Sequence, residues 1–156
     1  MFTELDDEHG LKLAIQQAKK SAKEGGVPIG SSLLTSVDGV VRVISASHNQ
    51  RIQKNSAILH GETATLEKAG RLKADVYRNA TMYTTLSPCD MCTGAIILYN
   101  IPRVVIGENA NFVGGEDYLR SRGVEVTVLE NQECKDLMSK FIKEHPEEWN
   151  EDIGEP

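Results

Sequence analysis

The chain has 156 residues, 40% of them hydrophobic and 26% charged, which fits one folded domain and excludes a disordered chain. Its net charge is −6, so it lacks the basic excess that phosphate-binding surfaces usually show. This charge argues against a nucleic-acid substrate.

The first part of the chain predicts a helix followed by a hairpin. Apolar residues recur at helical spacing, and Asp6 or Asp7 is available as the N-cap. Gly25 and Gly26 end this helix. Two β-rich runs at residues 32–35 and 40–46 flank Asp38-Gly39, which is a strong turn signal for a hairpin.

The rest of the chain alternates strands with helices. A helix runs from about residue 60 to 71, and a strand at 81–85 breaks at Ser87-Pro88 into another helix, with proline suited to the first turn. Beyond it we expect a strand at 104–107, a helix near 116–122, a strand at 124–129 and a helix over about 132–143. This alternation predicts an α/β fold with a central mixed sheet covered on both faces.

Location is predicted from what the sequence lacks. No window approaches the roughly 18 apolar residues of a membrane span, and the acidic residues 1–10 do not follow the plan of a signal peptide. Three cysteines are too few and too unevenly placed for a disulfide framework. We therefore expect a cytoplasmic protein with no membrane partner.

Two short motifs predict a metal site. Cys89 and Cys92 lie three residues apart at the start of a helix, so both thiolates can point to one ion, and the helix N-terminus lowers their pKa. His60 begins another helix and offers an imidazole. Three ligands of this kind are the preference of zinc.

The number of ligands favours a catalytic site. Catalytic zinc sites keep one position for water, whereas structural sites fill all four. The candidates for a fourth ligand are not spaced to join the motif; they are His9, His48, Cys134 and His145. Glu62 is poorly placed to chelate beside His60, but it could reach a water molecule in the open position.

The combination is more specific than its parts. Taken alone, a Cys-x-x-Cys or a His-x-Glu is weak, whereas His-x-Glu followed by Pro-Cys-x-x-Cys is the signature of zinc deaminases. At these residues the chain resembles the fungal (yeast-type) cytosine deaminases of the zinc-dependent cytidine deaminase superfamily. Gly61 supports this, because many nucleoside, tRNA and guanine deaminases carry alanine there. The similarity covers nearly the whole chain, with matches at residues 25–30, 48–49, 60–62, 86–95, 101–103, 107–109 and 149–155.

The resemblance implies a site, a fold and an assembly. It implies one Zn²⁺ per chain held by His60, Cys89 and Cys92, with Glu62 as the proton shuttle. It also implies substrate contacts from Ile29, Asn49, Gly61, Ser87, Cys89, Phe112, Trp149 and Asp152. The implied fold is a three-layer αβα sandwich around five strands, formed by one domain over residues 1–156, and the implied assembly is a homodimer.

The implied reaction is hydrolysis of free cytosine to uracil and ammonia in pyrimidine salvage. A zinc-bound hydroxide attacks C4, while Glu62 moves protons to ring N3 and to the leaving amine. Alternatives are deamination of another base or nucleoside, including adenosine in tRNA, and a non-catalytic zinc interaction domain. A thiol redox pair at Cys89 and Cys92 is a further alternative.

Several of these residues also have an ordinary structural interpretation. Asn49 on its own is more typical of a turn, His48 of a hydrogen-bonded structural histidine, and Phe112 of a plain core residue. Composition alone favours a frayed terminus over residues 146–156, whereas the resemblance makes that tail a lid over the active site.

Overall fold

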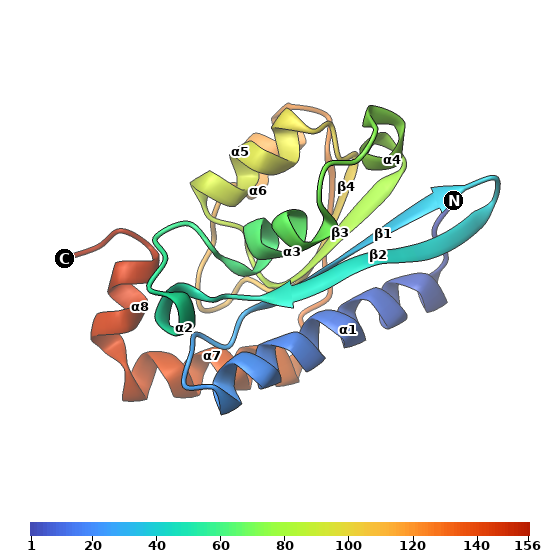
Figure 1. Ribbon diagram of the computed structural model, residues 1–156. Helices are drawn as coiled ribbons and strands as arrows, with labels where there is room; N and C mark the ends of the chain where they lie inside the picture. Colours follow the sequence, from blue (N-terminus) through green and yellow to red (C-terminus); the bar gives the residue numbers. More distant parts are fainter.

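The computed structural model describes residues 1–156 as eight helices and five strands (Figure 1). In chain order they are α1 (Glu4–Lys23), β1 (Gly30–Val37), β2 (Val40–His48), α2 (Arg51–Lys54), α3 (Gly61–Ala69), α4 (Ala74–Arg78), β3 (Ala80–Leu86), α5 (Asp90–Leu98), β4 (Arg103–Glu108), α6 (Glu116–Ser121), β5 (Glu125–Val128), α7 (Gln132–Glu144) and α8 (Pro146–Asp152). None of these helices combines the length and the apolar character that a membrane span requires.

The five strands form one mixed sheet in the order β2-β1-β3-β4-β5. β1 runs antiparallel to both β2 and β3, whereas β3, β4 and β5 are parallel to one another. The predicted hairpin turn is confirmed: Asp38 and Gly39 have φ values of 53° and 77°, as a two-residue turn between twisted strands requires. The predicted mixed sheet is confirmed as well.

Helices cover both faces of the sheet and make three layers, as predicted. In Figure 1, α1 and α7 lie on one face and α3, α5 and α6 on the other. Neighbouring residues of β3 serve opposite layers, since the Tyr83 side chain packs with Ala14 of α1 while Met82 packs with Ile96 of α5. This period of two is expected for a strand buried on both sides.

Two local predictions are wrong. The N-cap of α1 is Thr3, because its hydroxyl accepts the Asp6 N–H (3.2 Å) while the Asp6 carboxylate accepts the Thr3 N–H (2.8 Å), a reciprocal arrangement that Asp6 and Asp7 cannot make as caps. Pro88 lies just before the N-cap of α5, Cys89, rather than in the first turn.

The C-terminal tail is ordered, so the interpretation as a frayed terminus is also wrong. Residues Pro146–Asp152 form α8, which follows α7 directly and lies beside α2 (Figure 1). Proline suits the start of this helix. Trp149 and Asp152 are 6% and 7% exposed, so α8 is anchored by buried side chains.

Candidate active site

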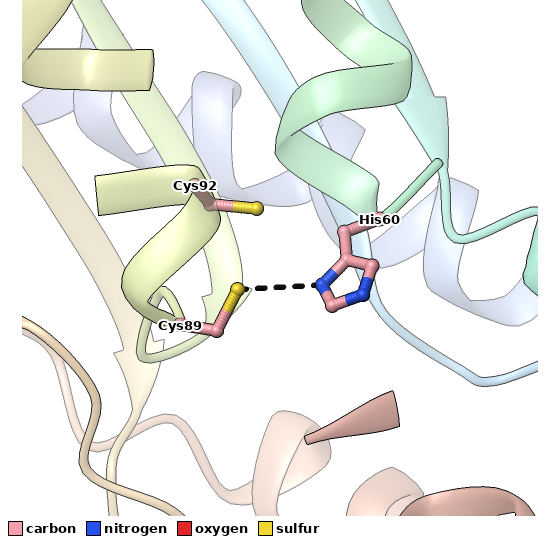
Figure 2. A group of neighbouring side chains, drawn as sticks. All are labelled: His60, Cys89 and Cys92. Atoms are coloured by element: carbon pink, nitrogen blue, oxygen red, sulfur yellow. Dashed lines mark hydrogen bonds between the residues drawn. The ribbon is translucent and has the colours of Figure 1, made fainter. Parts of the chain in front are cut away.

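Two helix starts on the same face of the sheet bring the candidate metal ligands together. β3 ends at Leu86 and the chain turns into α5, which places Cys89 at the N-cap and Cys92 in the first turn. His60 is the N-cap of α3, where Thr63 Oγ1 accepts its backbone N–H (2.9 Å). Figure 2 shows the His60 ring directed at the two sulfur atoms.

The distances fit a single metal ion. The three ligand atoms of His60, Cys89 and Cys92 lie within 4.8 Å of one another, and no fourth histidine, cysteine or carboxylate joins this group. Nδ1 of His60 lies 3.5 Å from Cys89 Sγ, whereas Nε2 faces Asp152 Oδ1 at 3.7 Å. One ring nitrogen thus faces the ion position and the other a carboxylate, the arrangement usual for metal-binding histidines. Two thiolates and an imidazole suit zinc.

The two cysteines share a hydrogen bond that shifts their pKa values in opposite directions. A hydrogen bond from Cys92, helped by another from His60, lowers the pKa of the Cys89 thiol to about 4 despite its burial. The same bond, together with burial, raises the pKa of Cys92 well above its usual value. Burial alone would lower the pKa of His60, but the Cys89 hydrogen bond and the Asp152 carboxylate outweigh it and raise this pKa. Without an ion, the pair therefore carries one thiolate, to which a cation would be attracted.

Glu62 lies beside this group on α3. It is only 4% exposed, and burial followed by the charge of Cys89 raises its pKa to about 7. A carboxyl group with such a pKa can both accept and donate a proton near neutrality, as a general acid and base must.

A small cavity opens over these residues. It is lined by Ile29, His60, Glu62, Leu86, Ser87, Cys89, Phe112, Trp149, Asp152 and Ile153. The Phe112 and Trp149 rings meet edge to face with centroids 5.8 Å apart. Gly61 lies close to Ile29, since a Cβ at position 61 would be 3.2 Å from Ile29 Cγ2. The cavity is thus narrow, apolar on its walls and polar at the metal end.

Asn49 and Asp152 lie 103 residues apart in the sequence and meet at this site. Asn49 is fully buried, and its Nδ2 donates to Asp152 Oδ1 at 2.7 Å. Burial raises the pKa of Asp152, and the neighbouring His60 and Asn49 partly oppose the shift. Asn49 is therefore part of the site through Asp152, although it is not among the residues that line the cavity.

The structure adds residues that sequence reasoning missed. Leu86 and Ile153 line the cavity. Ile153 directly follows Asp152, so a helical tail with that carboxylate turned inward would have suggested it. The buried Glu116 is also new: it accepts a hydrogen bond from Ser87 Oγ (2.7 Å), which in turn accepts the Gly114 N–H (2.9 Å). This chain of bonds ties the loop that carries Phe112 to the start of α5.

Comparisons with known proteins agree with this geometry. The family model described as "Cytidine and deoxycytidylate deaminase zinc-binding region" matches residues 5–108. A cytosine deaminase from Candida albicans is 61% identical over 150 residues, which are 96% of this chain and 98% of that protein. A tRNA-specific adenosine deaminase from Bacillus subtilis is 34% identical over 149 residues, 88% of this chain and 89% of the relative.

A solved structure shares the fold. It comes from a study of A-to-I editing by tRNA:A34 deaminases and matches with a TM-score of 0.68 at 28% identity, covering 83% of this chain and 99% of its own. Together with the family match over most of the chain and the 61% identity, this likeness shows that the chain belongs to the zinc-dependent cytidine and deoxycytidylate deaminase family, on its cytosine deaminase branch.

Proposed function

We propose that the chain hydrolyses free cytosine to uracil and ammonia, with Glu62 as the proton shuttle and His60, Cys89 and Cys92 as the zinc ligands. The observation that carries this proposal is the joint position of Glu62, His60 and Cys89 in the lining of one small cavity. The cytosine deaminase relative, 61% identical over nearly the whole chain, supports the choice of base.

The chemistry divides between the ion and the chain. Zinc held by the three ligands would lower the pKa of water and so supply hydroxide near neutrality. Glu62 takes the proton released by this water and gives it to ring N3, which makes C4 electrophilic. As the C4–O bond forms, C4 carries both a hydroxyl group and the amine. Glu62 then takes the hydroxyl proton and passes it to the amine, so the C4–N4 bond breaks and ammonia leaves as the C4=O group of uracil forms. Because its pKa is about 7, Glu62 can serve both steps.

The remaining residues orient the base and keep out water. Asp152 can accept a hydrogen bond from the exocyclic amine, and Asn49 can meet the opposite edge of the ring. Trp149 and Phe112 cover the ring plane, with Ile29 on the cavity wall. We infer that residues 146–156 act as a lid, because α8 supplies both Trp149 and Asp152. Backbone groups of Gly61, Ser87 and Cys89 complete the binding site.

A second candidate is deamination of adenosine in tRNA, the activity for which the Bacillus subtilis relative is named. The charge around the entrance favours the free base instead. A larger hollow outside the cavity is lined by Asp90, Glu151, Asp152 and Glu155 but by no lysine or arginine. Acidic side chains in this position repel the phosphates of a nucleic acid.

We also propose a homodimer, which the surface of α5 supports. The helix exposes Met91 (37%) and Leu98 (67%), followed by Tyr99 (43%), and Tyr118 of α6 is 53% exposed. An apolar helix at the surface is usually covered by a partner. Analytical ultracentrifugation should show a dimer, and Leu98→Lys should produce monomers; a monomeric wild-type protein would refute this assembly.

The three free thiols fit a reducing compartment, so we place the enzyme in the cytoplasm.

The decisive experiment follows cytosine loss by ultraviolet absorbance. Activity should disappear with a chelator and return with zinc. Glu62→Ala should keep one zinc per chain and lose at least about 10²- to 10⁴-fold in kcat. Glu67→Gln is a matched control, because Glu67 lies on the same helix and is exposed. Loss of zinc from Glu62→Ala would make Glu62 a ligand, and preference for cytidine or tRNA over cytosine would refute the proposed substrate.

A further inference from the structure

A buried hydrogen-bond network lies behind Asn49 and has no part in the mechanism above. His48 ends β2 and is 5% exposed. Its Nδ1 lies 2.8 Å from the backbone oxygen of Asn49. Since a carbonyl oxygen can only accept, Nδ1 carries the hydrogen and donates it. The imidazole therefore holds the peptide group of the residue that contacts Asp152.

Three further side chains complete this network. Ser21 Oγ donates to the same Asn49 oxygen at 3.1 Å. On the other side of the imidazole, His48 Nε2 lies 3.4 Å from Glu24 Oε1. Gln53 Nε2 donates both to Ser21 Oγ (3.0 Å) and to Glu24 Oε1 (3.4 Å). Asn49 is thus fixed against the C-terminal end of α1 and against α2.

The bonds that Asn49 makes leave part of its amide free. Its N–H donates to the Ile29 carbonyl (2.9 Å), and its Oδ1 accepts the Arg51 N–H (3.0 Å). Its Nδ2 donates one hydrogen to Asp152. One amide hydrogen and one lone pair of Asn49 remain unused. These two groups match the adjacent N1–H and C2=O of a pyrimidine base.

We propose that His48 is a positioning residue for the deaminase reaction, acting through Asn49. It fixes the Asn49 carbonyl, while Glu24 accepts a hydrogen bond from Gln53, the partner of Ser21, and together they set the angle at which the Asn49 amide meets the base. This role rests on the proposed function. It differs from a purely structural role because its effect on kcat/KM must pass through the side chain of Asn49.

A double-mutant cycle tests this dependence. His48→Phe keeps a ring of similar size but has no donor, and it should raise KM for cytosine about 10-fold while changing kcat much less. His48→Asn retains a donor near the Nδ1 position and should recover most of the loss. In an Asn49→Ala background, His48→Phe should change kcat/KM by less than about twofold, because the group it positions is gone. Zinc content and melting temperature are measured for every variant.

Glu24→Gln is the milder companion, since the Glu24 side chain is 40% exposed and its loss does not threaten folding. It should raise KM about two- to threefold, and this effect too should vanish with Asn49→Ala. An equal fold-change with and without the Asn49 amide, in either series, would overturn the positioning role. A folded, zinc-loaded wild-type protein that does not consume cytosine would instead refute the proposed function, and the role of His48 with it.

Discussion

Trp149 is the main anchor of α8, and replacing it with alanine should release the lid. The indole is 6% exposed and packs in a cluster with Val27, Ile29, Leu86, Met138 and Phe141. A buried tryptophan removes about 200 Å² from water, worth about 5 kcal/mol at ~25 cal/mol/Å² as an upper estimate. Alanine retains a small part of this, so Trp149→Ala should remove about 3–4 kcal/mol from the docking of α8.

Such a loss changes the ratio of docked to undocked α8 by several hundredfold, at about 1.4 kcal/mol per tenfold. Because α8 follows β5 and takes no part in the strand pairing, it can detach while the sheet stays folded. Hydrogen exchange measured by mass spectrometry should therefore accelerate over residues 146–156 much more than over β3 and β4. With cytosine as substrate, kcat/KM should fall about 100-fold. Trp149→Phe should retain most of both properties.

Leu5→Ala is the control, since Leu5 is 75% exposed on α1, and it should change neither exchange nor activity. Unchanged protection of residues 146–156 in Trp149→Ala would show that the indole does not hold the helix. The argument for a lid anchored by this side chain would then be refuted.

Three other perturbations have defined outcomes. Asp7→Asn should lower the free energy of unfolding by about 1–3 kcal/mol at pH 7, because it breaks the ion pair with Arg103 (2.5 Å). Burial alone would raise the pKa of Asp7, but hydrogen bonds from Arg103 and Tyr83 hold this pKa below 3.8. The wild-type advantage is therefore present above about pH 4 and fades as the pH falls towards the lowered pKa of Asp7. Urea titrations at pH 7 and pH 3 would measure this, and an advantage as large at pH 3 as at pH 7 would contradict it. Gly114→Ala should raise KM for cytosine by displacing the loop, because its Cβ would lie 1.9 Å from the Pro88 carbonyl oxygen, and unchanged kinetics would show that the loop adapts. Removal of zinc should lower the melting temperature reversibly, because the ion would join α3 to α5, and an unaltered temperature would speak against that link.

The sequence was most informative where local chemistry decides the conformation. The turn at Asp38-Gly39 predicted the hairpin, and the alternation of strands with helices along the chain predicted the mixed sheet. The candidate metal group could be predicted because two short motifs at helix starts carry it. The N-cap of α1 was missed because Thr3, Asp6 and Asp7 can all cap a helix, and the reciprocal bonds that identify Thr3 as the cap are visible only in the folded chain.

Buried polar residues were the main omission. Glu108 is fully buried, and its carboxylate accepts the backbone N–H groups of Ala110 (2.8 Å) and Asn111 (3.0 Å). Glu116 is buried beside Ser87. In a sequence such glutamates look like ordinary surface charges, because the donors that compensate them come from loops whose path is unknown until the chain is folded.

The candidate ligands stand on two helix starts that are fixed by the sheet, whereas the aromatic walls of the cavity come from the loop before α6 and from α8. The candidate ligands and this part of the substrate pocket are therefore encoded in separate parts of the chain. Changes in the walls can accumulate without disturbing the centre, which suits a family whose members carry names as different as cytosine deaminase and tRNA-specific adenosine deaminase. For protein engineering, this separation directs libraries for new substrates to residues 109–115 and 146–156, with both helix starts left unchanged.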